Sequence, residues 1–498
     1  MRDGTHADVA TRNAVNEMTG RLKNTAGAIT LSKNGDVGVH FSSNRMSWAY
    51  IKDGSIFYGI EPGQVHGHQS SSNGPPVMDV DPYKILKILK WGISYANRRI
   101  SVASLYIGTG ALEKDLLKVT KENMMGNKAL KLSVLLDYQR GTRGEVNSRS
   151  LLQEFLTTIP EQCNISLYQT PRLHGSWSKA LPARYNEIVG LQHMKLYIVD
   201  DSVLLSGANC SKDYFERRQD RYIEIQDADL ADFYCELIDE MSNYSKRCVK
   251  DGYIENKHAS REAVTQEVNE KIINFIERWH NKQYSISDPN KDTWVFPLIQ
   301  MGEFDVRQDE RVTQGLLGSA PSHSLIRLAT GYFNLTGEYA DTLLKDCKAN
   351  ISLLMAHPNA NGFMGASGPA GGIPHAYSLI ARKFWNRVEA SNQTNRVQML
   401  EYERPDWTFH AKGLWYYPPG SGVPWATLVG SANLGERSVK RDLEAQAAIF
   451  TVSSELQEKL HNEIALLHAH AAECSRELQE RSAPLWVRAT VGLFRTYF

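Results

Sequence analysis

Several features that would assign this chain of 498 residues to a simple class are missing from it. Lysine and arginine together number 56, and so do aspartate and glutamate, which leaves a formal net charge of zero. This balance argues against a protein that binds nucleic acid through a broad basic surface, because such binding needs a surplus of positive charge. No apolar run approaches the roughly 18 residues needed to span a bilayer, so we expect any action on a membrane to occur at its surface.

Cysteine is sparse and irregularly placed. The sequence has no Cys-x-x-Cys pair, which is typical of reduced, mostly buried thiols in an intracellular protein. The spacing offers no zinc site, so we expect neither a metal ion nor a cofactor. The first forty residues show no secretory hydrophobic segment and mix acidic with basic residues, so they indicate no organelle address. The cysteines are Cys163, Cys210, Cys235, Cys248, Cys347 and Cys474.

The main positive feature is a degenerate internal repeat. Each copy has three apolar segments typical of buried strands, with helix-like segments between them, then a histidine-containing segment and a turn of small residues. The shared order and similar spacing predict two copies of one α/β unit. These elements fall at 99–107, 131–138, 164–171, 190–199 and 206–209 in the first copy, and at 325–333, 350–357, 396–403, 407–417 and 430–433 in the second.

The remaining segments suggest how the chain is divided. Residues 1–80 include a linker-like stretch at 66–76 and are expected to form a partly flexible extension. Apolar residues at helical spacing predict a connector helix over 259–283 and an amphipathic helix after the second copy. Aromatic residues and arginines without acids near the C-terminus favour an interfacial tail, although packing on the body is the alternative. The predicted parts are 1–80, a first repeat 81–248, a connector 249–293, a second repeat 294–453 and a C-terminal segment 454–498.

The two histidine segments carry the candidate chemistry. His193 and Lys195 are two residues apart, as are His410 and Lys412, so in a strand each pair projects to one side. A neutral imidazole can attack phosphorus or move a proton, and a lysine supplies a fixed positive charge for a phosphate oxygen. One such pair alone would suggest a buried structural histidine. Its repetition favours a functional site.

Each histidine segment is followed by an asparagine and then by an acid. Asn209 and Asn433 end the small-residue turns, and their amide groups could donate to the same phosphate oxygens. Asp220 and Glu444 lie eleven residues after these asparagines. A carboxylate at that position could bind one imidazole nitrogen and fix which tautomer faces the substrate.

This pattern resembles the HxKx4D signature of the phospholipase D superfamily, which is followed by a Gly/Ser-rich turn and an asparagine. The first copy has the full signature from His193 to Asp200, whereas the second has Tyr417 in place of the aspartate. Within the superfamily the chain is most similar, from Ile100 to Ile449, to mitochondrial-type phosphatidylglycerophosphate synthases, the CDP-diacylglycerol–glycerol-3-phosphate 3-phosphatidyltransferases. The similar blocks include LLDYQRGTRG, GLQHMK, RRQDRY, TGYFNLT and RDLEAQ.

The resemblance implies an α/β fold in which two phospholipase D-like α/β/α repeats pack with pseudo-two-fold symmetry around a shared active site. It also implies a metal-free reaction through a covalent phosphatidyl-histidine intermediate, the first committed step toward phosphatidylglycerol and cardiolipin. One histidine attacks CDP-diacylglycerol and releases CMP. The other protonates CMP and then deprotonates the sn-1 hydroxyl of glycerol 3-phosphate. We assign His193 as the nucleophile, because its copy keeps the full signature, and His410 as the general acid and base.

The resemblance extends to supporting residues. Lys195, Lys412, Asn209 and Asn433 would stabilise charge on the phosphate oxygens, Asp220 and Glu444 would orient the imidazoles, and Asp200 would support the site or form a hairpin turn. The turn Gly108, Thr109 and Gly110 could bind nucleotide phosphates, and the Gly-rich stretch 361–372 could be a lid, a lipid-entry loop or an ordinary loop. The arginines proposed for substrate phosphates are Arg140, Arg143, Arg149, Arg221 and Arg437.

Other functions remain open at this stage. A phosphatidylserine or cardiolipin synthase shares the two-histidine chemistry and differs in its acceptor, and a phospholipase D-type phosphodiesterase uses water. A non-catalytic lipid-binding scaffold would be expected to lose one His-x-Lys pair, and neither pair is lost. The resemblance implies a mitochondrial protein, peripheral on the inner membrane at a surface with anionic lipid, without a transmembrane segment and without nucleic acid as a partner. It leaves the oligomeric state open.

Overall fold

The structure is a computed structural model in which the chain forms two compact units. One unit comprises Met1–Ser71 with Ile276–Val295, and the other comprises Ser72–Phe275 with Phe296–Phe498. The residues that the structure describes are 6–23, 25–32, 36–43, 48–52, 55–59, 66–68, 77–79, 82–173, 189–255, 260–284, 291–366 and 368–494.

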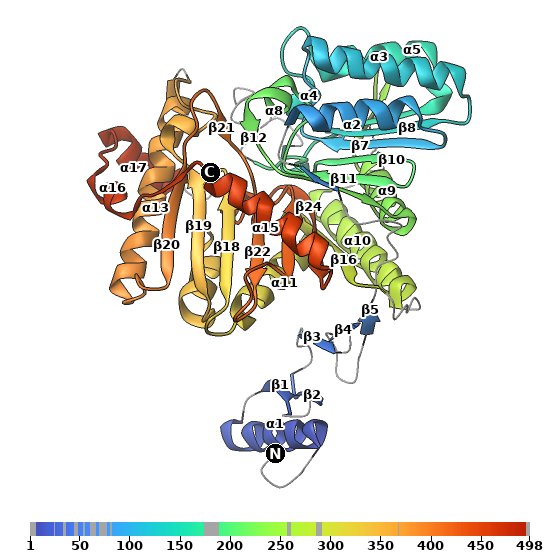
Figure 1. Cartoon of the computed structure of the whole chain (residues 1–498). Helices are drawn as coiled ribbons and strands as arrows, with labels where there is room; N and C mark the ends of the chain where they lie inside the picture. The colour runs from blue at the N-terminus through green and yellow to red at the C-terminus, as the bar shows by residue number, and fades with distance from the viewer. Residues whose placement is uncertain are drawn as a thin grey trace. The chain divides into compact units, whose positions relative to one another are not determined.

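The first unit has regular secondary structure within the segment predicted to be a partly flexible extension. Helix α1 (Ala7–Leu22) packs on a hairpin of β1 (Gly27–Leu31) and β2 (Val37–Phe41), and its buried residues are Ala7, Thr11 and Val15 (Figure 1). Strands β3 (Trp48–Lys52), β4 (Ser55–Gly59) and β5 (His66–His68) form a three-stranded antiparallel sheet. Composition alone did not indicate these elements.

The second unit contains, within its described residues, two nine-stranded mixed sheets of matching topology. The three central parallel strands β7, β8 and β9 of the first sheet correspond to β18, β19 and β20 of the second. In the first sheet, three antiparallel strands, β10, β11 and β13, continue from β7. In the second sheet, β22, β23 and β24 continue from β18 in the same way. The prediction of two α/β repeats is therefore confirmed.

The order of the first sheet is β15-β14-β9-β8-β7-β10-β11-β13-β6, and that of the second is β17-β16-β24-β23-β22-β18-β19-β20-β25. The first contains β6 (Val77–Asp79), β7 (Arg99–Ser104), β8 (Lys131–Asp137), β9 (Cys163–Tyr168), β10 (Leu196–Val199), β11 (Ser202–Ser206), β13 (Tyr222–Gln226), β14 (Lys246–Val249) and β15 (Gly252–Ile254). The second contains β16 (Thr293–Met301), β17 (Val306–Arg307), β18 (Leu325–Thr330), β19 (Asn350–Ala356), β20 (Val397–Tyr402), β22 (Gly413–Tyr417), β23 (Ala426–Gly430), β24 (Leu443–Thr451) and β25 (Ala471–Glu473).

Helices cover both faces of each sheet, which makes each repeat an α/β/α layer. In the first repeat α2, α3 and α5 lie on one face and α9 lies on the other (Figure 1). In the second repeat α11, α12 and α13 share a core with one face, and α15 buries Leu456, Leu460, Ile464 and Leu467. The bounds are α2 (Pro82–Ser94), α3 (Ala111–Gly126), α4 (Tyr138–Gly141), α5 (Ser148–Thr158), α8 (Lys212–Glu216), α9 (Ala228–Ser242), α11 (Gln308–Ser319), α12 (Gly337–Asp341), α13 (Ile373–Ala390), α14 (Glu436–Lys440) and α15 (Ser454–His468).

Helix α10 (Arg261–Tyr284) confirms the predicted connector helix, and its apolar stripe of Val264, Val268 and Ile272 is buried. Helix α15 likewise confirms the amphipathic helix predicted after the second copy, but that helix does not continue through Leu478 as its apolar spacing indicated. The chain leaves α15 after His468, adds the short strand β25 to the edge of the second sheet, and continues as α16 (Ser475–Glu480) and α17 (Leu485–Phe494). Pairing of β25 with the edge strand β20 satisfies backbone groups that a continuous helix would leave open there.

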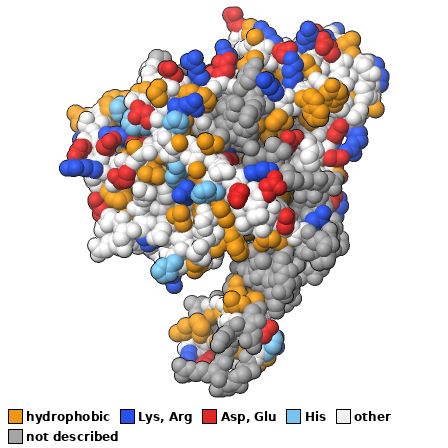
Figure 2. Space-filling view, in the orientation of Figure 1, with side chains coloured by type: hydrophobic (Ala, Val, Ile, Leu, Met, Phe, Trp, Pro, Cys, Tyr) orange, Lys and Arg blue, Asp and Glu red, His pale blue; other side chains and the backbone are white. Residues whose placement is uncertain are grey.

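The last features of the fold concern the charges on the surface and the length of the helices. On the face shown in Figure 2, acidic and basic side chains are interspersed over the described residues. Within the described ranges, every helix is too short or too polar to cross a bilayer.

Candidate active site

Both His-x-Lys segments lie just outside their own sheets and pair with the opposite repeat. The His193 amide donates to the Leu443 carbonyl at 2.9 Å, and the Leu443 amide donates to Leu191 at 2.8 Å. In the pseudo-equivalent place β21 (Thr408–Phe409) runs parallel to β12 (Arg218–Gln219), and the His410 amide donates to Gln219 at 2.8 Å. The prediction that the histidines lie within the strands of their own sheets is therefore wrong. Strands β10 and β22 begin only after the lysines, because the preceding backbone is used to join the two repeats.

This backbone pairing places each histidine beside an acid of the opposite repeat. Since Leu443 precedes Glu444 and Gln219 precedes Asp220, each pairing brings an acid of one repeat beside the histidine of the other. His193 Nδ1 lies 2.9 Å from Glu444 Oε1, and His410 Nδ1 lies 2.7 Å from Asp220 Oδ2. The imidazoles are only 8% and 5% exposed, and both carboxylates are fully buried. A carboxylate at Nδ1 favours the tautomer in which Nδ1 carries the proton and Nε2 carries the lone pair.

The small-residue turn makes room for this arrangement. A Cβ atom at Gly207 would lie 2.7 and 2.9 Å from the Asp220 carboxylate oxygens and 3.1 Å from Lys412 Nζ. Any larger residue there would displace the acid that contacts His410. On the other side, Ser438 donates to Glu444 Oε1 at 2.5 Å and holds the second acid in place.

The two lysines lie close to the histidines. Lys195 Nζ donates to the His193 carbonyl at 2.5 Å and Lys412 Nζ donates to the His410 carbonyl at 2.9 Å. Burial lowers the pKa of Lys195 well below its usual range and that of Lys412 to about 8. Glu444 raises the pKa of Lys195 and Lys412 lowers it, so charges from both repeats act on the same group. The charges of the two His-x-Lys pairs thus influence one another.

The electrostatics favour neutral imidazoles. Burial lowers the pKa of His193 and of His410 well below the usual value, and the adjacent lysines lower both further. Burial raises the pKa of Glu444 to about 7, although the positive charge of Lys195 lowers it. A neutral imidazole with its Nε2 lone pair available is the form that can act as a nucleophile or as a base.

The two asparagines also lie beside the site. Asn209 accepts from the Leu105 amide at 3.3 Å, and its Nδ2 donates to the Tyr214 hydroxyl at 3.1 Å. Thr330 Oγ1 donates to Asn433 Oδ1 at 3.4 Å. The asparagine side-chain oxygens therefore accept hydrogen bonds from a neighbouring backbone amide and a neighbouring hydroxyl group.

Tyrosines and one further arginine surround His410, and sequence reasoning missed them. The rings of Tyr214 and Tyr332 meet the imidazole edge-on at centroid distances of 5.2 and 5.5 Å. Tyr377 stacks on Tyr332 at 5.4 Å, and Arg218 lies over Tyr214 at 4.7 Å. A signal was present for Arg218: it lies two residues before Asp220 in RRQDRY, so the two side chains project to the same side.

The structure separates the predicted arginines into two groups. Arg437 lies near His193, whose pKa it lowers, and it pairs with Asp442 at 2.9 Å. Arg140 lies over the Tyr106 ring at 4.8 Å, and both residues influence the pKa of Tyr332. These two stay candidates for substrate binding.

The expectation for Arg221 is wrong. Its guanidinium is fully buried, pairs with Glu463 at 2.7 and 2.9 Å, donates to Leu428 and Thr427, and lies 4.0 Å from the Trp415 ring. Arg149 is also directed elsewhere, because its Nη2 faces the carbonyls of Val249 and Gly252 in the β14–β15 turn. Arg143 is exposed beyond the end of α4. A basic cluster in sequence did not reveal where each side chain points.

Asp200 is a turn residue rather than a catalytic one. It lies beyond the far end of β10 from Lys195, has a positive φ of 52°, and accepts hydrogen bonds from the amides of Asn97, Arg98 and Arg99. Burial opposes its ionisation, but these backbone donors outweigh that effect and the pKa is lowered. The second copy has Tyr417 at the position of this aspartate. Its ring packs beside His461 of α15.

The turn at Gly108, Thr109 and Gly110 does not form a phosphate cradle. Cβ atoms at Gly108 and Gly110 would lie 2.1 and 2.7 Å from carboxylate oxygens of Glu113, which is buried. An anionic side chain already occupies the space that nucleotide phosphates would need, so this expectation is wrong.

One group of residues at the site has metal-ligand character. Single ligand atoms of His193, Asp442 and Glu444 lie within 4.8 Å of one another. Asp442 is already paired with Arg437 and accepts from the Leu191 amide at 3.0 Å. A bound cation would have to compete with Arg437 and the nearby Lys195, so these residues do not fit a metal ion.

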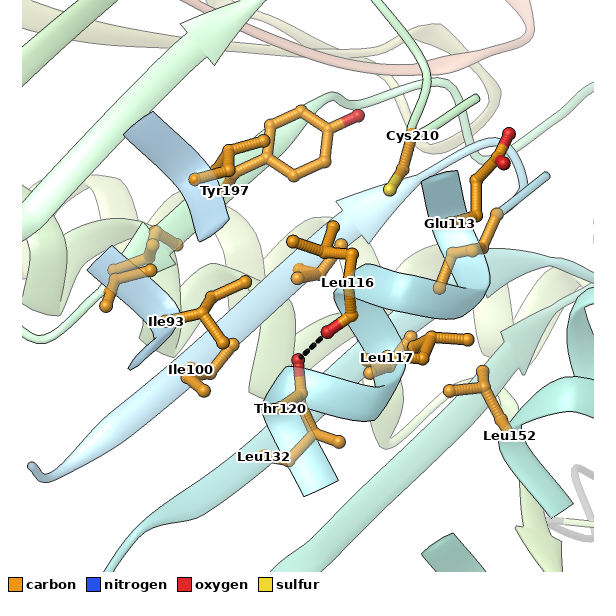
Figure 3. A pocket seen from close by; sticks show the side chains of 16 residues that line it. Ile93, Ile100, Glu113, Leu116, Leu117, Thr120, Leu132, Leu152, Tyr197 and Cys210 are labelled. Carbon is orange, nitrogen blue, oxygen red and sulfur yellow. Dashed lines mark hydrogen bonds between the residues drawn. The ribbon is translucent and has the colours of Figure 1, made fainter. Parts of the chain in front are cut away.

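Two cavities lie away from the histidines. One, of about 40 Å³, lies in the apolar core of the first repeat between α2, α3 and the sheet, where Figure 3 shows Leu116, Leu117 and Leu132 around it and Glu113 at one end. The other, of about 250 Å³, lies between α13 and α16 and is lined by His357, His375, Arg382 and Arg481. Neither is lined by either His-x-Lys pair.

The chain is similar to known proteins both in sequence and in structure. The human protein named "CDP-diacylglycerol--glycerol-3-phosphate 3-phosphatidyltransferase, mitochondrial" is 41% identical over 455 residues, covering 84% of this chain and 82% of the human protein. A Saccharomyces pastorianus protein with the name "CDP-diacylglycerol--glycerol-3-phosphate 3-phosphatidyltransferase" is 32% identical over 418 residues, covering 77% of this chain and 80% of its own length.

The crystal structure of phosphatidylserine synthase from Haemophilus influenzae matches with a TM-score of 0.66 and 20% identity, covering 86% of this chain and 94% of that one, which supports the fold. A family profile described as "Asparaginase" matches residues 1–60 only, in the first unit.

Proposed function

The chain belongs to the CDP-diacylglycerol–glycerol-3-phosphate 3-phosphatidyltransferases of the phospholipase D superfamily, and we infer from this that it makes phosphatidylglycerophosphate and CMP from CDP-diacylglycerol and glycerol 3-phosphate. The observation that carries the mechanism is the crossed pairing of two buried imidazoles with acids of the opposite repeat. It supplies two activated imidazoles at a single site, which is what a double displacement at phosphorus requires.

In the first step we assign His193 as the nucleophile. Its Nε2 attacks the phosphorus that carries the diacylglycerol, an N–P bond forms, and the P–O bond to CMP breaks. Glu444 stabilises the positive charge that develops on the imidazole. Lys195 and Lys412, with the amide groups of Asn209 and Asn433, stabilise the charge on the oxygens of phosphorus in the transition state.

His410 supplies the proton that leaves with CMP. In the free protein its imidazole is neutral, because burial and then Lys412 lower its pKa. The bound pyrophosphate brings negative charge that offsets Lys412 and so favours the protonated imidazole. In the second step the neutral His410 takes the proton of the sn-1 hydroxyl, the hydroxyl oxygen bonds to phosphorus, and the N–P bond to His193 breaks. Asp220 orients His410 in both steps.

The lipid substrate requires contact with a membrane surface. We propose a peripheral position on the mitochondrial inner membrane, consistent with the names of the relatives and with the absence of a spanning helix among the described residues. The exposed Leu485 and Trp486 of α17 are candidates for that contact. The C-terminal residues 495–498 of the predicted interfacial tail lie outside the described residues.

The test of the reaction is an acceptor panel. Labelled CDP-diacylglycerol is incubated with glycerol 3-phosphate, serine, phosphatidylglycerol or water alone, and the lipid products are identified. We expect phosphatidylglycerophosphate with glycerol 3-phosphate and little product in the other reactions. Phosphatidylserine, cardiolipin or phosphatidic acid as the main product would assign the protein to one of the alternative functions instead.

The covalent step has a separate test. In the absence of an acceptor, lipid-labelled CDP-diacylglycerol should leave label on the protein, and the label should be acid-labile as expected for a phosphoramidate. We expect His193→Ala to retain no label. Label retained by this variant but lost from His410→Ala would exchange the two roles.

A further inference from the structure

Arg218 is positioned by the same backbone exchange that builds the site. It lies in β12, which pairs with β21, and its Nε donates to Thr408 Oγ1 at 3.0 Å. Thr408 precedes His410 by two residues, so both side chains project to the same side of β21. Thr408 and His410 are about 7 Å apart along the strand. The charge of Arg218 also lowers the pKa of His410, so the guanidinium lies on the His410 side of the site.

The charge of Arg218 is weakly compensated. Its side chain is 17% exposed, and the single carboxylate within ion-pair range among the described residues is that of Asp213, at 3.7 Å and 66% exposed. Arg437, by contrast, pairs at 2.9 Å with the buried Asp442, and Arg221 pairs with the buried Glu463. Guanidinium groups that are largely removed from water need an anion close by. Of these three arginines, Arg218 has the most distant and most exposed carboxylate partner among the described residues.

Residues of both repeats lie against Arg218. Its guanidinium lies over the Tyr214 ring, which itself contacts the His410 ring. From the second repeat, Gly362 approaches so closely that a Cβ atom there would lie 3.2 Å from Arg218 Nη2 and 3.8 Å from the Tyr332 hydroxyl. A side chain larger than glycine at position 362 would therefore press on the guanidinium.

We propose that Arg218 binds the phosphate of the acceptor and thereby selects glycerol 3-phosphate over acceptors without a phosphate. This inference rests on the proposed function. When the sn-1 hydroxyl meets His410, the phosphate lies at the other end of a three-carbon chain, and a guanidinium one strand position beyond His410 matches that separation. The phosphate of CMP is bonded directly to the leaving oxygen and therefore lies closer to the two lysines. Arg218 consequently acts on the acceptor rather than on the nucleotide.

The proposal replaces part of the earlier expectation. The sequence analysis proposed Arg140, Arg143 and Arg149 among the arginines for substrate phosphates, but Arg149 faces the β14–β15 turn and Arg143 is exposed. Arg140 over Tyr106 remains a neighbour of the same tyrosine cluster. A guanidinium is suited to a phosphate because its forked donors make two parallel hydrogen bonds.

The test compares two acceptors that differ only in the phosphate. For Arg218→Gln we expect kcat/KM for glycerol 3-phosphate to fall about 10–100-fold, as for loss of a hydrogen-bonded charge, while kcat/KM for glycerol and KM for CDP-diacylglycerol stay within about twofold. Arg218→Lys should be intermediate. The matched control is Arg217→Gln, which changes the exposed neighbouring arginine and should behave like the wild type.

A second variant displaces the guanidinium without changing its charge. Gly362→Ala adds a methyl group against Nη2, and we expect it to raise the KM for glycerol 3-phosphate several-fold with little effect on the use of glycerol. The proposal would be overturned if Arg218→Gln lowered kcat/KM equally for glycerol 3-phosphate and for glycerol, or if its preference for glycerol 3-phosphate were unchanged.

A binding measurement separates this inference from the proposed function. Calorimetric titration of glycerol 3-phosphate into the protein, without lipid donor, should give binding to the wild type and to Arg217→Gln and at least tenfold weaker binding to Arg218→Gln. Equal affinity of glycerol 3-phosphate for the wild type, Arg217→Gln and Arg218→Gln would overturn the role of Arg218, whichever reaction the protein catalyses. Normal phosphatidylglycerophosphate synthesis with unchanged acceptor preference in Arg218→Gln would leave the function standing and remove this inference alone.

Discussion

The imidazoles of His193 and His410 are equivalent in geometry, since each binds a buried carboxylate through Nδ1. They differ in their surroundings. The rings of Tyr214 and Tyr332 lie against His410, in addition to the charges of Lys412, Asp220 and Arg218 that influence its pKa. Arg437 and Asp442 are among the charged groups that influence the pKa of His193. This asymmetry fits two different roles on the two sides of one phosphorus atom.

Removal of either imidazole should stop the first half of the reaction. We expect His193→Ala and His410→Ala each to lower CMP release from CDP-diacylglycerol at least about 10³-fold, because residues that act as one unit cannot replace each other. The assay is CMP formation with purified protein, with the thermal midpoint as a check of folding. His461→Ala on α15 is the control and should keep the wild-type rate. Near-normal CMP release by either site variant would contradict the two-histidine mechanism.

The same residues predict a bell-shaped pH dependence. Burial raises the pKa of Glu444 to about 7, so below that pH the carboxyl gains a proton and loses the charge that supports His193. Burial lowers the pKa of Lys412 to about 8, so above that pH the ammonium loses its proton and its charge. We therefore expect CMP release to be fastest between about pH 7 and pH 8.

Profiles of kcat/KM against pH for wild type and variants check this assignment. Arginine keeps its charge at these pH values, so Lys412→Arg should move the alkaline limb upward. Glu444→Gln should be slow and should lack the acid limb. An alkaline limb that stays in place in Lys412→Arg would assign it to another group.

The residue types of the site were predictable from the sequence, but their partners were not. Repetition of His-x-Lys, asparagine and acid identified His193, His410, Asp220 and Glu444 as a group. It could not show that each acid contacts the histidine of the other copy, because that contact is made by backbone pairing between segments 190 or more residues apart. Arg221 was misassigned for a related reason: nearness in sequence to a motif does not fix the direction of a side chain. For Asp200 the sequence left a role at the site and a hairpin turn open, and the structure shows the turn.

At the scale of elements, the central strands of both sheets follow from their apolar runs, because strands covered by helices on both faces are almost continuously hydrophobic. The departures occur where pairing between distant segments decides the structure. The His-x-Lys backbone leaves its sheet to pair across the repeats, and β25 interrupts the predicted C-terminal helix at the edge of the second sheet. Local periodicity carries no information about such partners.

A buried ion pair fastens α15 to the second sheet. Arg221 comes from the first repeat, Glu463 from α15, and Trp415 on β22 donates to the same carboxylate at 2.9 Å. We expect Arg221→Met to lower the free energy of unfolding by about 3–5 kcal/mol, because it leaves the Glu463 carboxylate buried without a partner. Chemical denaturation monitored by fluorescence measures the change.

The double variant distinguishes a structural from a substrate-binding role. Arg221→Met with Glu463→Leu removes both charges and should recover most of the lost stability. At a temperature where the variants are folded, the KM for glycerol 3-phosphate and for CDP-diacylglycerol should match the wild type. A large rise of either KM in the stable double variant would return Arg221 to the substrate site.

At the scale of the whole molecule, the two repeats are copies that cannot act separately. Each provides a histidine whose orienting acid belongs to the other, and the lysine charges of both copies influence one another. A duplicated fold could instead carry two independent sites, one in each copy. The crossed contacts argue for a single site, and the difference between the two arrangements can be measured.

Substitution of one acid at a time tests this point. With two independent sites, Asp220→Asn would disable one and leave about half of the activity. With one shared site, we expect Asp220→Asn and Glu444→Gln each to lower kcat about 10²–10⁴-fold, since either change frees an imidazole to adopt the wrong tautomer. The double variant should be little slower than the slower single variant, because the residues act as one unit.

The isosteric control is Asp201→Asn. Asp201 is a surface acid of the first repeat that pairs with Arg98, so this variant should keep the wild-type rate. Retention of half the wild-type kcat by either single variant would show that the copies work independently.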